Sequence, residues 1–173
     1  MFSRVLTPRG QALAALVGLA LAGLAAPVLL QSPPRLVWNA TASAPVGLWA
    51  ITPGAAVQVG DSVLVWPPPP ARRLAAQRHY LPANVPMIKA VAAVSGDRVC
   101  ALEASVTVND RRVAVRRLAD RRGQKLPWWR GCQRLSRGQF LLINPAPDSF
   151  DSRYFGPVEG RAIIGKARLL WRR

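Results

Sequence analysis

Apolar residues in this chain form one long run near the N-terminus and a series of short runs after it. The long run extends from Ala12 to Leu30 without a charged residue, close to the ~20 residues that a helix needs to cross the hydrocarbon core of a bilayer. The later runs are short and are separated by prolines and glycines, of which the chain has 16 and 13. The pattern therefore predicts one N-terminal membrane helix followed by a domain of short strands.

The short apolar runs are rich in Val, Leu, Ile and Trp and end at proline, glycine or Asn-Asp, which is typical of strands bounded by turns. A hairpin turn is expected at Asn109-Asp110, and a short helix over 71–80. Many short strands with few helical periods indicate a mainly β fold, a sandwich or a barrel-like domain. The predicted strands are 36–38, 47–51, 61–66, 87–94, 98–102, 106–108 and 139–143, with one or two more within 162–171.

The long apolar run also predicts an orientation. Arg4 and Arg9 precede it, so the positive-inside rule places the N-terminus in the cytoplasm and everything after Gln31 outside. A cleavable signal peptide is the alternative, but the run is long for a signal core. We therefore expect residues 1–31 to be a cytoplasmic N-terminus with a transmembrane anchor, and residues 32–173 to be an exported domain.

The charge of the chain is strongly positive, with 24 Lys and Arg against 8 Asp and Glu and a net charge of +16. Such a balance suggests nucleic acid, an anionic membrane surface or an acidic partner. The basic residues gather between Arg111 and Arg137, which we interpret as a basic surface facing solvent or lipid. Because no zinc-finger spacing, RNP-like aromatic pattern or basic zipper helix accompanies them, specific nucleic-acid recognition is not expected.

The two cysteines, Cys100 and Cys132, are too far apart in sequence for a CxxC redox pair or a zinc site. In an oxidising compartment they are expected to form one disulfide. The chain has a single histidine, His79, and no cluster of ligand residues near it, so neither a metal nor another cofactor is expected.

Lys89 is the most informative single residue. It is one of only three lysines in a chain rich in arginine, and it lies within the otherwise uncharged apolar segment 87–94. Burial disfavours the ammonium form and lowers a lysine pKa, and a neutral lysine can act as a general base. The alternative is a lysine whose stem packs on the strand while its head reaches water.

Ser43 lies among small residues, with Ala42 and Ala44 on either side and Pro45 and Gly47 following. Small neighbours leave the hydroxyl accessible, and a serine beside a neutral lysine can be activated as a nucleophile. By itself such a serine is usually just part of a turn.

Three sequence blocks stand out: Asn-x-Thr-x-Ser-x-Pro-x-Gly-Leu-Trp at 39–49, Ile-Lys-Ala-Val-Ala-Ala-Val-Ser-Gly-Asp at 88–97, and Asp-Ser-Phe-Asp-Ser-Arg-Tyr-Phe-Gly-Pro at 148–157 with Ile-Gly-Lys-Ala at 164–167. Together they resemble the membrane-bound signal peptidases of the serine–lysine type, and among them most of all the TraF-type peptidases of conjugative plasmid transfer. The resemblance spans nearly the whole chain. Ser95 stands where the family commonly has proline. The segment 144–147, Asn-Pro-Ala-Pro, replaces the Gly-Asp-Asn stretch of general signal peptidases, which favours the TraF-type branch.

The resemblance implies a signal-peptidase or LexA-like β domain behind a single transmembrane helix, anchored in a bacterial inner membrane with the domain in the periplasm. It also implies Ser43 as the nucleophile and Lys89 as the general base. Asp151 completes the implied catalytic set.

The remaining residues that the resemblance implies support this set. The Thr41 hydroxyl and the backbone N–H of Ser43 would bind the oxyanion, and Ser149 would orient the Lys89 amine. Asp151 would act through Arg153.

The implied function is a serine endopeptidase that processes an exported pilin-like precursor with small residues near the cut, with hydrolysis and cyclisation both open. Inner-membrane lipids and other transfer-apparatus proteins are the further partners expected. Three alternatives remain: a housekeeping type I signal peptidase, a LexA-type self-cleaving protein, which the membrane anchor disfavours, and a non-catalytic basic scaffold of the transfer apparatus.

Overall fold

The structure is a computed structural model that describes residues 7–29 and 32–173. The chain divides into two compact units, Met1–Pro34 and Arg35–Arg173, which are described separately. Arg4, which contributes to the predicted orientation, and the predicted end of the anchor at 30–31 lie outside the described residues.

The described residues of the first unit contain one helix, α1 (Pro8–Leu29), so the prediction that the long apolar run is helical is confirmed up to Leu29. Apolar side chains such as Leu13, Leu16 and Leu19 are exposed on it. Across 7–29 and 32–173, no helix meets the combined length and apolarity expected of a membrane span. The membrane-spanning role of α1 stays a prediction.

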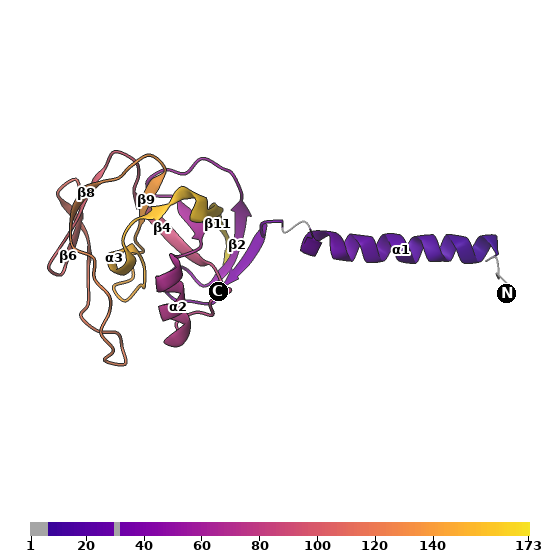
Figure 1. The fold of residues 1–173 in the computed structure, drawn as a ribbon, viewed down its shortest axis with the longest axis horizontal. Helices are drawn as coiled ribbons and strands as arrows, with labels where there is room; N and C mark the ends of the chain where they lie inside the picture. Colours follow the sequence, from indigo (N-terminus) through magenta and orange to yellow (C-terminus); the bar gives the residue numbers. More distant parts are fainter. Residues whose placement is uncertain (1–6, 30–31) are drawn as a thin grey trace. The chain divides into compact units, whose positions relative to one another are not determined.

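The second unit contains a seven-stranded sheet in which every neighbouring pair is antiparallel (Figure 1). The spatial order is β1-β2-β11-β3-β4-β9-β10, so the C-terminal strand lies between two strands from the start of the domain. Its strands are β1 (Leu36–Asn39), β2 (Gly47–Thr52), β3 (Ser62–Val65), β4 (Met87–Ala93), β9 (Gln139–Leu142), β10 (Val158–Glu159) and β11 (Ile163–Arg172).

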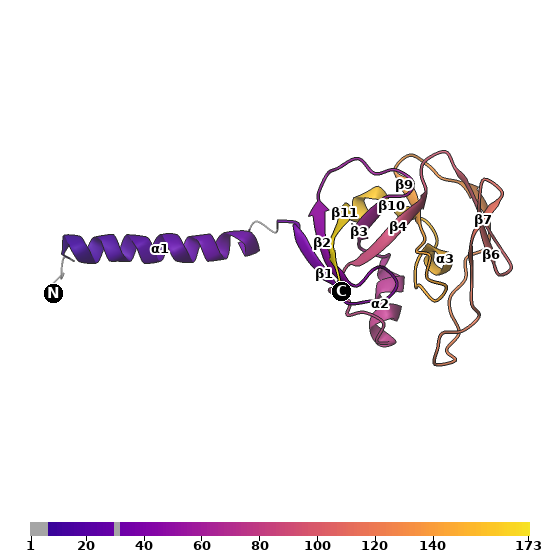
Figure 2. The ribbon, with the colours of Figure 1, turned by 180° about the vertical axis from the view of Figure 1, so that it is seen from behind.

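A second sheet of four antiparallel strands has the order β7-β6-β5-β8. Figure 2 shows β6 and β7 at the opposite end of this unit from β1 and β2. The strands are β5 (Arg98–Leu102), β6 (Ser105–Val108), β7 (Arg111–Val115) and β8 (Gly131–Arg134).

Three short helical segments complete the unit: α2 (Pro69–Gln77), α3 (Ser152–Phe155) and the 3-10 helix η1 (Gly160–Ala162). The helix predicted over 71–80 begins two residues earlier and ends earlier in the structure. Pro69 and Pro70 occupy its first positions, where the missing N–H of proline breaks no helical hydrogen bond.

Strand β4 lies between β3 and β9, and side chains on both of its faces are buried. On one face Ile88 packs with Trp49 and Leu64. On the other, Met87 and Val91 join a cluster that includes Phe150 and Tyr154 from the segment around α3. Side chains alternate between faces along a strand, so Lys89 lies on the same face as Met87 and Val91.

The prediction of a mainly β fold is confirmed, and every predicted strand is present. The Asn109-Asp110 turn is also confirmed, since both residues have positive φ, 48° and 65°, as a two-residue type I′ hairpin requires. The sequence analysis missed β7, β8 and the two-residue strand β10. Strands β7 and β8 are mostly exposed because they are the two edges of the small sheet and bury little.

The interpretation of 111–137 as a plain basic surface is wrong at Arg116, which is only 3% exposed. Its guanidinium lies 4.2 Å from the ring centroid of Trp128 and donates to the carbonyl oxygens of Glu103 and Trp129. A planar guanidinium can stack on an aromatic ring and donate in its own plane at the same time. Arg116 is therefore a structural residue that fixes the chain between β7 and β8.

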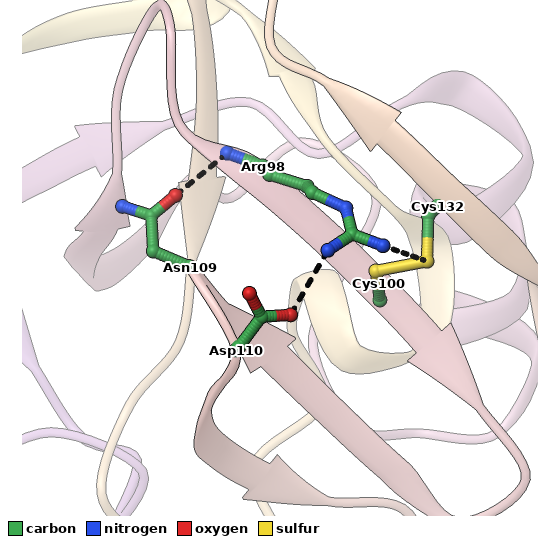
Figure 3. The surroundings of a disulfide bond; sticks show 5 residues. All are labelled: Arg98, Cys100, Asn109, Asp110 and Cys132. Carbon is green, nitrogen blue, oxygen red and sulfur yellow. Dashed lines mark hydrogen bonds and ion pairs between the residues drawn. A yellow bond between two sulfur atoms is a disulfide. The ribbon is translucent and has the colours of Figure 1, made fainter.

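The predicted disulfide joins Cys100 to Cys132 (Figure 3). The two cysteines are directly opposite each other on β5 and β8. Arg98 lies beside the bridge and pairs with Asp110 at 3.0 Å. The disulfide ties the end of the arginine-rich segment to the small sheet.

Candidate active site

Ser43 lies in the loop between β1 and β2 and is half-buried. Asn39, the last residue of β1, organises this loop through its buried side-chain amide. Its Nδ2 donates to the carbonyl oxygens of Thr41, Ala44 and Pro45 at 2.9, 3.1 and 3.0 Å. The loop conformation around Ser43 is thus set by one amide whose donors are satisfied within the loop.

Lys89 points from β4 toward this loop and is 3% exposed. Its Nζ lies 3.3 Å from Ser43 Oγ and 2.9 Å from Ser149 Oγ. Burial lowers the pKa of Lys89 to about 8. The charge of Asp151 opposes this shift and that of Arg153 adds to it. A lysine in this setting is neutral in a substantial fraction of molecules near pH 8.

Ser149 is almost fully buried, at 1% exposure, and lies in the turn that precedes α3. Its backbone N–H donates to the carbonyl oxygen of Ala146 at 3.1 Å, which holds the residue in the turn. Its hydroxyl is thereby directed at Lys89 Nζ, opposite Ser43. The lysine amine is held between two serine hydroxyls.

Asp151 and Arg153 form a buried ion pair, exposed by 0% and 2%. Arg153 Nε donates to Asp151 Oδ1 at 2.7 Å and Nη2 to Oδ2 at 3.0 Å. Arg153 also donates to the carbonyl oxygens of Asn144 and Pro147. Asp151 accepts from the backbone N–H of Asn144 and caps α3 through the N–H of Arg153. The pair therefore fixes the segment that carries Ser149.

The structure does not bring Asp151 into contact with the proposed reacting atoms. Within 7–29 and 32–173, none of its hydrogen bonds reaches Lys89 or Ser43. Its influence on Lys89 is electrostatic, since its charge acts to raise the lysine pKa. By geometry Asp151 is a positioning residue.

Asn144 is a residue whose position the sequence analysis did not recognise as important. It is 3% exposed, follows β9, and bonds to the backbone of β4 on both sides of Lys89. Its Oδ1 accepts from the N–H of Ala90 at 2.8 Å and its Nδ2 donates to the carbonyl of Ile88 at 3.1 Å. The sequence shows only that Asn144 stands between an apolar strand and a proline. This pattern does not indicate that its side chain bonds to β4.

The two expected oxyanion donors differ in whether they already donate a hydrogen bond. Among the hydrogen bonds of the described residues, none uses the backbone N–H of Ser43, so this donor is free. The Thr41 hydroxyl lies 3.4 Å from Ser43 Oγ but donates to Asn39 Oδ1 at 2.9 Å. Thr41 would have to rotate its hydroxyl hydrogen away from Asn39 to reach a developing oxyanion.

A cavity of about 470 Å³ opens beside Ser43 and Lys89. This volume lies in the range of sites that hold a ligand or a short stretch of substrate. Apolar residues such as Val37, Met87 and Phe150 line part of it, and His79 lies on its wall. In the described part of the chain no three His, Cys, Asp or Glu side chains are grouped as a metal site would need.

Comparison with known proteins places the chain in a family. The sequence profile of the family described as "Signal peptidase, peptidase S26" matches residues 9–172. The chain is 38% identical over 142 residues to a "Probable conjugal transfer protein TraF" of Sinorhizobium fredii, covering 75% of this chain and 73% of that protein. It is 35% identical over 146 residues to a "Plasmid transfer protein TraF" of Escherichia coli, covering 77% and 82%.

A further relative is the "Conjugal transfer protein TraF" of Agrobacterium fabrum, 32% identical over 140 residues, covering 75% of this chain and 78% of that protein. The crystal structure of a signal peptidase I from Enterococcus faecalis aligns with 68% of this chain and 98% of its own at 17% identity and a TM-score of 0.37. That structural likeness is too low to support a conclusion. The profile match and the sequence identities show that the chain belongs to the peptidase S26 signal peptidase family, together with the TraF proteins of conjugal transfer.

Proposed function

We propose that this protein is a membrane-anchored serine endopeptidase that uses a Ser43–Lys89 dyad to cut an exported, pilin-like precursor during conjugal transfer. The observation that carries the proposal is the surroundings of Lys89. Its buried amine lies 3.3 Å from Ser43 Oγ, and burial lowers its pKa to about 8. This is the combination that a lysine general base needs, a tuned pKa within hydrogen-bond reach of a hydroxyl.

In the first half of the reaction, neutral Lys89 takes the proton of Ser43 as Oγ attacks the carbonyl carbon of the scissile bond. The backbone N–H of Ser43 donates to the oxyanion of the tetrahedral intermediate, with the Thr41 hydroxyl as the second donor. An oxyanion donor of this kind is worth about 3–4 kcal/mol in the transition state. The intermediate then collapses, the C–N bond breaks, and the Lys89 ammonium gives its proton to the leaving amine.

In the second half, Lys89 is neutral again and Ser43 carries the acyl group as an ester. Lys89 takes a proton from the incoming nucleophile, which attacks the ester carbonyl, and Ser43 leaves with that proton. Water as the nucleophile gives hydrolysis. An amine at the other end of the same substrate chain gives a ring, and both outcomes use the same protein groups.

Ser149, Asn144, Asp151 and Arg153 hold this arrangement in place. Ser149 fixes the direction of the lysine amine through its 2.9 Å contact. Asn144 bonds to the residues on either side of Lys89, while the Asp151–Arg153 pair shapes the turn that carries Ser149. A dyad works only when its two members are held at fixed separation, because small displacements are costly in rate.

The location we propose is the periplasmic side of the inner membrane, with α1 as the anchor. Support comes from the uncharged apolar run within α1, the arginines before it, and the disulfide in the second unit, since disulfides persist outside the cytoplasm. Ser43 follows the end of α1 by only a short stretch of sequence. A substrate that is itself held in the membrane suits a nucleophile so near an anchor.

The test is intact-mass measurement of the candidate pilin precursor from cells with the wild-type protein, with none, and with the Ser43→Ala variant. We expect a processed product only with the wild type. A product mass that is lower by one water than the hydrolysed form would indicate ring closure. An unchanged precursor in all three samples would contradict a role in pilin processing, and equal processing with Ser43→Ala would contradict Ser43 as the nucleophile.

The anchor is tested by deleting residues 1–31 from the protein. We expect the shortened protein to cleave a membrane-held precursor much more slowly than the full chain does, because a shared membrane raises the effective concentration of the substrate. A short soluble peptide, which does not gain from the membrane, is the control. Equal rates on the membrane-held precursor would contradict the anchoring role.

A further inference from the structure

The cavity beside Ser43 and Lys89 has a second wall that the proposed chemistry does not use. It is formed by part of the arginine-rich arm, which we define as residues 116–126, between β7 and β8. Arg117, Asp120, Arg121 and Arg122 from this arm line the same cavity as Ser43. From the sequence we expect these arginines on a surface that faces solvent or lipid. In the structure they border the space where a substrate would lie.

The arm is held against the domain by specific contacts at both of its ends. At one end the backbone N–H of Arg117 donates to the Tyr154 hydroxyl at 3.1 Å. At the other, Arg78 Nη2 donates to the carbonyl of Lys125 at 2.8 Å. The Tyr80 hydroxyl also donates to Asp120 Oδ2. Such contacts make the arm a built wall of the cavity.

The acidic groups on this wall are already engaged. Asp120 accepts from Tyr80 and from the backbone N–H groups of Arg122 and Gln124, and lies 3.5 Å from Arg78. Asp148 pairs with Arg121. In the described part of the chain, neither Arg117 nor Arg122 has a carboxylate within ion-pair distance. Among the described residues, Arg117 and Arg122 are therefore two exposed arginines that line the cavity without a counter-charge.

We infer that Arg117 and Arg122 form a cationic subsite that takes a carboxylate of the substrate while another part of the substrate lies at Ser43. This inference rests on the proposed peptidase function and adds a substrate class to it: a chain with small residues at the cut and a carboxylate nearby. A guanidinium presents paired donors that match the two oxygens of a carboxylate. The carboxylate is either an acidic side chain or the chain terminus.

Turnover of matched peptides tests the subsite. The probes are fluorogenic decapeptides with alanine around the scissile bond and either Glu or Gln at one varied position, cleaved by the full-length protein in detergent. We expect kcat/KM to favour Glu over Gln by up to about tenfold at one position, because two exposed ion pairs at the upper end of their usual range together give about this factor. The Arg117→Gln/Arg122→Gln protein should bring the ratio near 1. The Arg117→Lys/Arg122→Lys protein should keep only part of it, because lysine retains the charge and loses the paired donors.

A control pair distinguishes local charge from total charge. Arg111 and Arg112 are exposed on β7 and are not among the residues that line the cavity. The Arg111→Gln/Arg112→Gln protein loses the same net charge and should keep the wild-type ratio. A Glu/Gln ratio of 1 in the wild type at every position, or equal loss in both Gln pairs, would overturn the subsite.

Binding separates this inference from the peptidase proposal. The labelled peptides are titrated into full-length Ser43→Ala protein at low and high salt, and fluorescence anisotropy is read. Tighter binding of the Glu peptide that weakens with salt supports the subsite even if the wild type cleaves nothing, in which case only the peptidase proposal fails. Cleavage of both peptides with equal binding would overturn the subsite and leave the peptidase proposal standing.

The source of the carboxylate is identified by a second peptide pair that ends in a free carboxylate or in an amide. A preference for the free carboxylate that disappears in the Arg117→Gln/Arg122→Gln protein assigns the subsite to a chain terminus. A preference for Glu alone assigns it to an acidic side chain. Peptides that bind alike whatever their end or side-chain charge would overturn both assignments.

Discussion

Two buried cations, Arg153 and Lys89, lie near the turn that carries Ser149, and their hydrogen-bond partners differ in charge. Arg153 is 2% exposed and its guanidinium is joined to both oxygens of Asp151. Lys89 is 3% exposed and has two neutral hydroxyls as partners. Burial of Lys89 lowers its pKa to about 8.

The difference shows how one small region holds both a structural charge and a reactive amine. Breaking a buried ion pair is costly because a charge is left without its counter-ion. A lysine with no direct counter-ion avoids that cost by losing its proton. Arginine cannot do so in a protein, so the residue type at each position matches the role that its neighbours permit.

The largest effect on kcat/KM is expected when Lys89, the reactive cation, is replaced by arginine, which stays charged. Lys89→Arg and Lys89→Ala should each lower kcat/KM by about 10⁴-fold or more, as should Ser43→Ala, because the members of such a unit act together. Peptide cleavage by the purified full-length proteins measures this. Lys166→Arg, a change at an exposed lysine paired with Asp61, is the control. Substantial cleavage by Lys89→Arg would remove lysine as the base.

Removing the counter-ion of the structural cation should have the next largest effect. Asp151→Asn leaves the Arg153 guanidinium buried without its carboxylate, and the free energy of unfolding should fall by about 3–5 kcal/mol. Chemical denaturation of the full-length protein in detergent measures it. Asp110→Asn disrupts an exposed pair with Arg98 and should change stability little. Equal, small losses in the two variants would show that the buried pair has no special structural role.

Replacing Lys89 with an apolar residue should stabilise the fold while it abolishes activity. The folded-state pKa lies below the ordinary 10.5, so the unfolded chain binds more protons. The free energy of unfolding therefore rises with pH between about 8 and 10.5. Lys89→Met should remove this slope and raise the free energy of unfolding at pH 7 by about 2–3 kcal/mol. A destabilised Lys89→Met protein with an unchanged pH slope would contradict burial as the cause; Lys166→Met serves as the exposed control.

The smallest effect is expected at the hydroxyl that orients the amine. The wild-type kcat/KM should rise about tenfold per pH unit below about 8 and level off above it, because only neutral Lys89 is a base. Ser149→Ala should lower kcat/KM about tenfold. It should also move the midpoint below that of the wild type, since the ammonium loses an acceptor.

A second buried serine provides the control for Ser149. Ser152 accepts from the N–H of Leu142 and does not bond to Lys89, so Ser152→Ala should leave the midpoint where it is. A Ser149→Ala profile with the wild-type midpoint would show that Ser149 does not act on the amine.

Much of the fold could be predicted from local pattern. Apolar runs of period two bounded by proline, glycine and Asn-Asp mark most of the strands, and the uncharged run marks α1. Strands β7 and β8 were not predicted, because they are short, contain arginines and are mostly exposed at the sheet edges. The burial of Arg116 was not predicted either, because the Trp128 ring covers it only in the folded chain.

For the candidate site, the sequence alone determined the residue types: a lysine in an apolar strand, a serine among small residues, and a family resemblance that joins them. Tertiary structure decided the rest. Ser43 and Lys89 are 46 positions apart, and Lys89 and Ser149 are 60 apart. Their distances depend on the pairing of β2 with β11, of β11 with β3, and of β4 with β3 and β9. Asn144 reaches the β4 backbone for the same reason. The arginines on the cavity wall are held by contacts with Tyr154 and Arg78 instead. All of these contacts join distant segments, and the local patterns that we used do not specify which segments meet.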